Sequence, residues 1–123
     1  MARTDRRVSY SPTGKVEDVT PEMAARGVEA VLGILAGRWK LEILFQLFSE
    51  GVRRFSELER AIPAISQKML TQQLRELERD GVVWRTVHPQ VPPKVEYGLT
   101  AWGQSLCPIL DRLLEWGAAK PKS

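Results

Sequence analysis

The sequence lacks several features that mark particular classes of protein. It has one cysteine, Cys107, among 123 residues, which excludes an internal disulfide and a cysteine-based metal cluster. No apolar run approaches the ~18 residues of a membrane-spanning helix, and the N-terminus has no apolar signal core. The single histidine, His88, has no clustered partners for a metal site or catalytic triad, and no glycine-rich phosphate loop is visible. We therefore expect a cytoplasmic protein without metal or cofactor, and not an enzyme.

The composition is that of one soluble globular domain. Hydrophobic residues make up 43% and charged residues 27% of the chain. The formal net charge is +3, and the stretch from residue 53 to residue 94 contains eight basic against five acidic residues, a surplus of three. This middle stretch therefore accounts for the whole net charge, which favours an anionic partner there.

The first part of the chain predicts an arm followed by two helices. Residues 1–20 are polar, which indicates a flexible N-terminal arm before a domain at residues 21–119. Threonine and proline at positions 20 and 21 predict the start of an amphipathic helix that ends near Gly37. The next run, RWKLEILFQLFSEG, is apolar on nearly every face and predicts a helix in the middle of the core, ended by Gly51.

Two shorter helices should follow, separated by a turn. Ser56 and Glu59 fit a capping box for the first, and Pro63 should end it. Ser66 can cap the second, SQKMLTQQLRELERDG, which has a leucine stripe and runs to Gly81. The face opposite the leucines carries Lys68, Gln72, Arg75 and Arg79. Such a helix pair is a helix-turn-helix candidate.

The residues after Gly81 predict a β-hairpin. Residues 82–88 and 94–99 contain β-branched and aromatic residues in loose alternation, and a loop with three prolines joins them. Proline fixes φ and donates no hydrogen bond, so the loop should be stiff and should not pair with another sheet edge. We expect a mildly basic hairpin that projects from the domain.

The last helix should begin after Thr100 and carry more apolar surface than one small core can cover. Leu106, Ile109, Leu113 and Trp116 recur at spacings of three and four, and Cys107, Leu110 and Leu114 form a second strip. This excess suggests a partner subunit. Pro108 should kink the helix because it removes one backbone hydrogen bond.

The predicted order is helix, helix, helix-turn-helix, hairpin, helix, which is typical of a winged helix-turn-helix, a mainly α fold with a small β-hairpin wing (α+β). From Val28 to Trp116 the chain resembles the HxlR family of winged-helix transcription regulators, relatives of MarR. The resemblance is carried by GRWKLEIL, RRFSELERAIPAISQKMLTQQLRELERDGVVWRT, VPPKVEYGLTAWG and the closing LLEWG.

The resemblance implies a bacterial or archaeal protein that dimerises through its N- and C-terminal helices and binds a palindromic operator in double-stranded DNA. Each subunit would supply one recognition helix, residues 66–80, and one wing, residues 84–99. The residues expected at the dimer interface are Val28, Leu32, Leu106, Ile109, Leu110, Leu113, Leu114 and Trp116.

One departure from the family pattern concerns thiol sensing. The family usually has a C-P-V-E motif just before its first helix, where this chain has residues 26–29, Arg-Gly-Val-Glu. The missing cysteine argues against oxidant sensing of that kind. Cys107 lies in an apolar helix stripe, where packing is the expected role. A small-molecule effector is left open, since four tryptophans could line a pocket, although core and interface positions are the commoner use.

The candidate DNA-binding residues are basic, amide or hydroxyl side chains around the predicted recognition helix and wing. Arginine and glutamine can read purine edges in the major groove, whereas serine, threonine and the flanking basic residues can contact phosphate. The alternative for such a cluster is a solvated helix face. The full set is Arg53, Arg54, Ser66, Lys68, Thr71, Gln72, Arg75, Arg79, Arg85 and Lys94.

The sequence therefore predicts a homodimeric, sequence-specific DNA-binding transcriptional regulator. Repression is the expected mode, because a domain of this size has no room for an activation module. The alternative is a winged-helix adaptor that binds another protein and does not read DNA.

Overall fold

A computed structural model of the chain describes residues 19–122, so that all but the last two residues of the predicted arm, 1–20, lie outside the described part. The chain divides into two compact units between Leu35 and Ala36. Among the described residues, no helix has both the length and the apolar character needed to cross a membrane.

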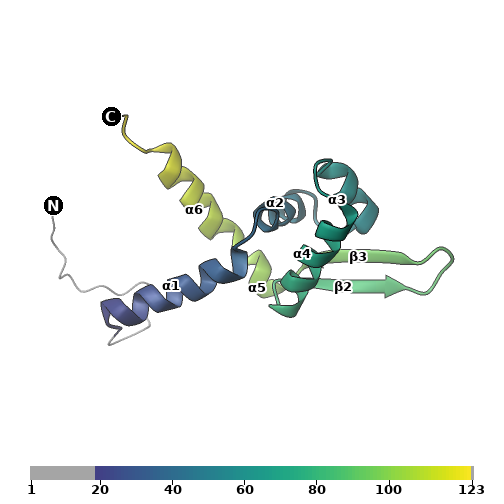
Figure 1. The fold of residues 1–123 in the computed structure, drawn as a ribbon, viewed down its shortest axis with the longest axis horizontal. Helices are drawn as coiled ribbons and strands as arrows, with labels where there is room; N and C mark the ends of the chain where they lie inside the picture. Colours follow the sequence, from purple (N-terminus) through teal and green to yellow (C-terminus); the bar gives the residue numbers. More distant parts are fainter. Residues whose placement is uncertain (1–18, 123) are drawn as a thin grey trace. The chain divides into compact units, whose positions relative to one another are not determined.

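The first unit contains helix α1, Pro21–Leu35 (Figure 1). Thr20 Oγ1 accepts a hydrogen bond of 3.1 Å from the Met23 N–H, which confirms the predicted helix start. The helix ends at Leu35, two residues before Gly37, whose φ of +122° is a conformation that favours glycine.

The second unit is built on helices α2 (Lys40–Glu50), α3 (Phe55–Ala61) and α4 (Gln67–Arg79). Their inward side chains form its core: Ile43, Leu44, Leu47, Leu58, Leu70, Leu74 and Leu77 are at most 1% exposed. The predicted leucine stripe of α4 is thus confirmed. Helix α2 is less enclosed than its sequence indicated, because Leu41 and Phe45 remain on the surface.

The predicted capping box of α3 is wrong by two residues. The helix begins at Phe55 and not after Ser56, so Ser56 lies within its first turn. The Glu57 carboxylate accepts the Arg54 N–H at 2.7 Å and therefore does what the sequence assigned to Glu59. The cause is tertiary, since the residues just before α3 belong to a strand.

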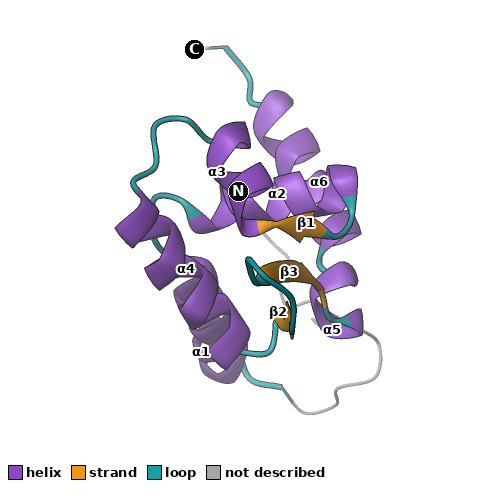
Figure 2. Cartoon of the chain, turned by 90° about the vertical axis from the view of Figure 1, so that its right-hand side faces the viewer, coloured by secondary structure: helices purple, strands orange, loops and turns teal. Residues whose placement is uncertain are grey.

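Three antiparallel strands form the sheet: β1 (Arg53–Arg54), β2 (Val83–His88) and β3 (Lys94–Leu99), in the order β1-β3-β2. The predicted hairpin is confirmed, and its register places Val83 opposite Leu99 and His88 opposite Lys94. Figure 2 shows α4 on one face of the sheet and the short helix α5 (Ala101–Gln104) on the other. The distal part of the hairpin extends past the helices of this unit as a wing (Figure 1). The unit is a winged helix-turn-helix, mainly helical with a small sheet.

The predicted single C-terminal helix with a kink is wrong, because the structure has two helices, α5 (Ala101–Gln104) and α6 (Cys107–Ala118). Pro108 lies in the first turn of α6, where its missing N–H leaves no hydrogen bond unmade. The predicted cap at Thr100 is confirmed, since its Oγ1 accepts the Gly103 N–H at 3.0 Å.

Candidate nucleic-acid interface

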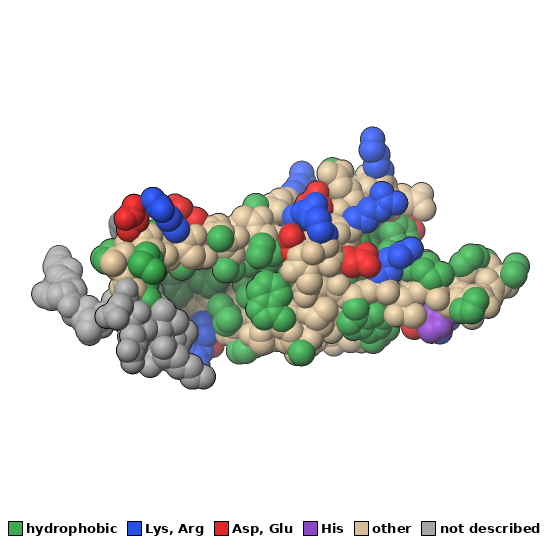
Figure 3. All heavy atoms as spheres, turned by 90° about the horizontal axis from the view of Figure 1, so that it is seen from below, with side chains coloured by type: hydrophobic (Ala, Val, Ile, Leu, Met, Phe, Trp, Pro, Cys, Tyr) green, Lys and Arg blue, Asp and Glu red, His purple; other side chains and the backbone are tan. Residues whose placement is uncertain are grey.

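Helix α4 presents a polar, basic face to solvent. Ser66 caps the helix by accepting the Met69 N–H at 3.0 Å, and the buried leucines fix which face points inward. The outward side chains, together with their neighbours, line one open hollow: Gln67, Lys68, Thr71, Gln72, Arg75, Glu76 and Arg79. Lysine and arginine side chains gather on the side of the molecule that α4 forms (Figure 3).

The basic side chains of this face are largely free of internal partners. Arg79 lies 3.6 Å from Asp80 and stays 70% exposed. Lys68 and Arg75 are exposed and form no ion pair within residues 19–122. Charges held in this way can meet phosphates or base edges without first breaking a contact within the described chain.

The two hydroxyl side chains of the predicted set bond to the helix backbone. Ser66 Oγ is occupied as the cap, and Thr71 Oγ1 donates to the Gln67 carbonyl at 2.9 Å. A phosphate needs a donor: Thr71 has used its one O–H on the helix backbone, whereas Ser66 accepts as the cap and keeps its O–H free to donate. Ser66 can therefore both cap α4 and donate to a phosphate, whereas Thr71 stabilises the first turns of α4.

The sheet register separates the two basic residues of the wing. Arg85 lies opposite Tyr97, and both project from the face that α4 covers. Burial raises the pKa of the Tyr97 hydroxyl, and the guanidinium groups of Arg85 and Arg75 oppose this rise. Arg85 therefore lies at the base of the wing, on the sheet face that α4 covers.

Lys94 projects from the opposite face of the hairpin, because it pairs with His88 in the register. Its Nζ lies 3.5 Å from Glu96, and His88 Nε2 lies 2.7 Å from the same carboxylate. The contact with His88, followed by the charge of Lys94, lowers the pKa of Glu96. His88, which had no partner in the sequence pattern, thus has one across the strands.

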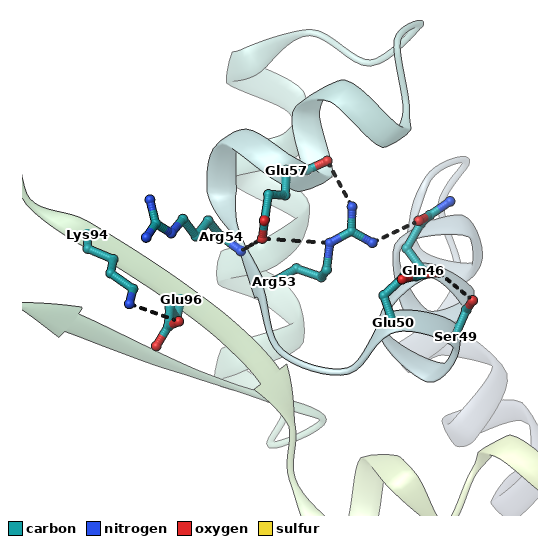
Figure 4. Close-up of polar contacts among 8 residues, drawn as sticks. All are labelled: Gln46, Ser49, Glu50, Arg53, Arg54, Glu57, Lys94 and Glu96. Atoms are coloured by element: carbon teal, nitrogen blue, oxygen red, sulfur yellow. Dashed lines mark hydrogen bonds and ion pairs between the residues drawn. The ribbon is translucent and has the colours of Figure 1, made fainter.

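Arg53 and Arg54, two of the candidate DNA-binding residues, have different surroundings (Figure 4). The Arg53 guanidinium donates to Gln46 Oε1 of α2 and to the Glu57 carbonyl of α3, each at 3.4 Å. Its side chain is 18% exposed and joins two helices. Arg54 is exposed, and its register position opposite Glu96 places it on the hairpin face that carries Lys94.

Sequence reasoning missed Lys40 and Glu76. Lys40 is 5% exposed at the start of α2, and its ammonium forms an ion pair with Glu76 Oε1 on α4. Glu76 Oε2 accepts a hydrogen bond of 3.4 Å from Gln72 Nε2. A lysine in an otherwise apolar run, GRWKLEIL, was the one available signal, because a buried lysine needs an acidic partner.

This ion pair should make stability depend on pH. Lys40, then Gln72, lower the pKa of Glu76 from its ordinary 4.5, so the pair stabilises the fold above pH 4.5 and stops doing so as pH falls through the lower folded-state pKa. We expect Glu76→Gln to be less stable than wild type at pH 7, with the difference shrinking below pH 4.5. Urea unfolding between pH 7 and pH 3, with Glu78→Gln as the exposed control on the same helix, measures this. A difference that is constant down to pH 3 would contradict it.

The residues predicted at the dimer interface divide into exposed and buried positions. Val28 and Leu32 on α1 are exposed, as are Ile109, Leu113, Leu114 and Trp116 on α6, with Trp116 78% exposed. Leu106 is half-buried, and Leu110 is only 5% exposed within the chain. Leu110 therefore has little surface left to offer a partner.

Known proteins resemble this chain over most of its length. The model of the HxlR-like helix-turn-helix family matches residues 34–123. The HTH-type transcriptional regulator YtcD of Bacillus subtilis is 59% identical over 91 residues, which are 74% of this chain and 71% of YtcD. A crystal structure of ytcD matches with a TM-score of 0.69. The match covers 74% of this chain and 92% of the ytcD chain in that structure. The structure of the redox regulator HypR in its reduced form is 48% identical in sequence and has a TM-score of 0.70. The match covers 76% of this chain and 91% of the HypR chain.

Proposed function

Because the chain belongs to the HxlR family of DNA-binding helix-turn-helix transcriptional regulators, we propose that it binds a palindromic operator as a homodimer, with α4 of each subunit in the major groove and the wing at the DNA backbone. The observation that carries this proposal is the outer face of α4, where Lys68, Arg75 and Gln72 are exposed beside one another. Arginine and glutamine there can reach base edges, and lysine can reach phosphate.

The surroundings of the other candidates refine their roles. Arg79 and Arg85 extend the basic face of α4 along the helix and onto the wing base, where they would neutralise phosphates. Arg54 and Lys94 lie on the other hairpin face and would contact phosphate only where the wing tip reaches the duplex. Arg53 has a structural role between α2 and α3.

Repression is the regulatory mode we propose. A small dimer that occupies a promoter blocks RNA polymerase without a further domain, and the matched family region, residues 34–123, has no room for an additional activation module. An effector would act on this dimer by changing the spacing of its two recognition helices.

Selection of bound fragments from random duplex DNA at near-physiological salt tests this function without assuming a target. We expect enrichment of an inverted repeat whose half-sites lie about 10 base pairs apart, one helical turn. Binding that falls steeply with salt and enriches no sequence would show a nonspecific DNA binder and contradict the proposal.

Dimerisation is proposed to use the exposed apolar residues of α1 and α6. Leu113 is 51% and Ile109 56% exposed, and single-chain packing leaves both in water. We expect Ile109→Lys/Leu113→Glu to sediment as a monomer at concentrations where wild type is a dimer. Glu115→Lys, on the polar side of the same helix, is the matched control and should stay dimeric. A wild type that sediments as a monomer would contradict dimerisation, and a double variant that stays dimeric would place the interface elsewhere.

DNA binding by this chain should be insensitive to thiol oxidants, unlike regulation through an N-terminal cysteine. Its one cysteine, Cys107, is half-buried in the first turn of α6. We expect diamide to change operator affinity less than about twofold, because partial burial limits the access of the oxidant to the thiol. Electrophoretic mobility shifts of wild type and Cys107→Ala, each with and without oxidant, measure this. A large oxidant effect that Cys107→Ala abolishes would make Cys107 a sensor.

A further inference from the structure

A chain of polar contacts runs from the interior of the second unit to the outer face of α4. It begins at the buried Lys40 ammonium, which forms an ion pair with Glu76 Oε1. It continues from Glu76 Oε2 to Gln72 Nε2, 3.4 Å away and one helical turn earlier. The contacts therefore connect a fixed buried cation with the glutamine at the centre of the proposed DNA-reading face.

The chemistry of these groups fixes the orientation of the Gln72 amide. A carboxylate oxygen only accepts hydrogen bonds, so Gln72 must turn its NH2 group toward Glu76. The amide oxygen, Oε1, is then left free and can only accept, while the second N–H of the amide remains beside it, an arrangement that matches the N6 amino group and N7 of adenine. In the major groove, acceptors are met by the exocyclic amino groups of adenine and cytosine, whereas guanine and thymine present acceptors of their own.

A carboxylate on a DNA-binding face normally weakens binding, because it repels phosphates. Lys40 offsets this charge from beneath the surface, and its contact lowers the pKa of Glu76. The carboxylate is thus kept ionised at a place where its charge is compensated. This arrangement is expected where the carboxylate holds another side chain at the surface, as Glu76 holds Gln72.

We propose that Glu76, anchored by Lys40, is a positioning residue that holds the Gln72 amide with its oxygen toward the DNA, so that Gln72 selects an adenine or cytosine. This inference rests on the proposed function, since it assigns a specificity to the same face of α4. The first of its two tests needs no DNA. The contact between Gln72 and Glu76 can therefore be tested separately from its effect on base selection.

Nuclear magnetic resonance of the full, DNA-free chain tests the contact. We expect the side-chain NH2 signals of Gln72 to shift as Glu76 is protonated during an acid titration, and to lose this shift in Glu76→Ala. Glu78→Ala, which removes a carboxylate elsewhere on α4, should leave the shift in place. Gln72 signals that ignore the ionisation of Glu76 would overturn the proposal whatever the DNA experiment gives.

Selection from random duplexes tests the use of the contact. Gln72→Ala first identifies the base pair that Gln72 selects. Glu76→Ala should relax the preference at that same base pair by about tenfold, and Gln72→Ala/Glu76→Ala should relax it no further than Gln72→Ala does. Glu78→Ala should keep the wild-type preference. A changed preference at a different base pair, or an intact one, would overturn the proposal.

Loss of the carboxylate leaves Lys40 without its partner, so a second variant guards against misfolding. Lys40→Met/Glu76→Leu replaces the ion pair by apolar groups of similar size, a change that folded proteins generally tolerate. It should fold, bind DNA and show the same relaxed preference. A folded double variant with the full wild-type preference would also overturn the proposal. A wild type that selects no sequence would remove the proposed function, and this use of Glu76 with it.

Discussion

Replacing Gln72 and Arg75 of α4 with glutamate is expected to reduce operator affinity at least about 100-fold, because it removes a base contact and a cation and adds two charges that repel phosphates. Both side chains lie on the exposed face of α4, away from the leucine core, so the fold should survive. Fluorescence anisotropy with a labelled operator, at several salt concentrations, measures the loss. The salt dependence should fall as well, since fewer counterions are released.

Arg112→Glu gives the matched control for this charge reversal. Arg112 is exposed on α6, outside the α4 face, and its reversal should lower affinity far less. Sedimentation should show both proteins with the oligomeric state of wild type. A glutamate variant of α4 that still binds the operator would show that another surface reads the DNA. If the wild type binds no duplex DNA and the glutamate variant loses a protein partner, the result would instead favour an adaptor.

Gly103→Ala is expected to destabilise the fold by about 3 kcal/mol, the cost of forcing a side chain into a filled space. A Cβ at this position would lie 2.1 Å from the Val82 carbonyl oxygen. That oxygen cannot easily move, because the Thr100 N–H donates to it at 3.1 Å and Thr100 Oγ1 at 3.2 Å. Chemical denaturation followed by circular dichroism measures the change.

Gly117→Ala is the control for the change of residue type. A Cβ at Gly117 of α6 would meet nothing within 4 Å. Alanine is favoured over glycine in helices by up to about 1 kcal/mol, so this variant should equal or exceed wild type in stability. If Gly103→Ala were as stable as wild type, α5 would have to move away from the start of the hairpin.

The sequence predicted features that depend on near neighbours. The caps at Thr20, Ser66 and Thr100 each use a hydroxyl and an amide three residues apart, so a short pattern contains all the relevant atoms. The hairpin and the leucine stripe of α4 follow from periodicity in the same way. These local rules were sufficient to place the helix-turn-helix and the wing.

The errors have tertiary causes. The start of α3 is set by Arg53 and Arg54, which pair with β3 and are therefore extended up to Phe55. The sequence indicates a short extended piece, VRRF, before Ser56, but a strand of two residues is too short for its pattern to show that it ends at Arg54. Pro108 fits a helix start as well as a kink, and the sequence alone does not decide between them.

In the candidate site, too, local patterns were predictable from the sequence and contacts between separate elements were not. The exposed face of α4 was evident from the spacing of Lys68, Gln72 and Arg75, whereas the role of Arg53 depends on Gln46 of another helix. The ion pair of Lys40 with Glu76 likewise joins residues from separate helices. A charged side chain can be recognised in a sequence, but its partner is set by how the elements pack.

The position of β3 in the sheet has a consequence for the order in which the chain can fold during synthesis. Within residues 19–122, both β1 and β2 pair only with β3, and β3 is the last of the three to be made. Until residues 94–99 have left the ribosome, β1 has no strand to join, although α2, α3 and α4 are already complete. The helices must therefore hold together first through their leucines, and the sheet closes onto them late, as expected for pairings between distant parts of a chain.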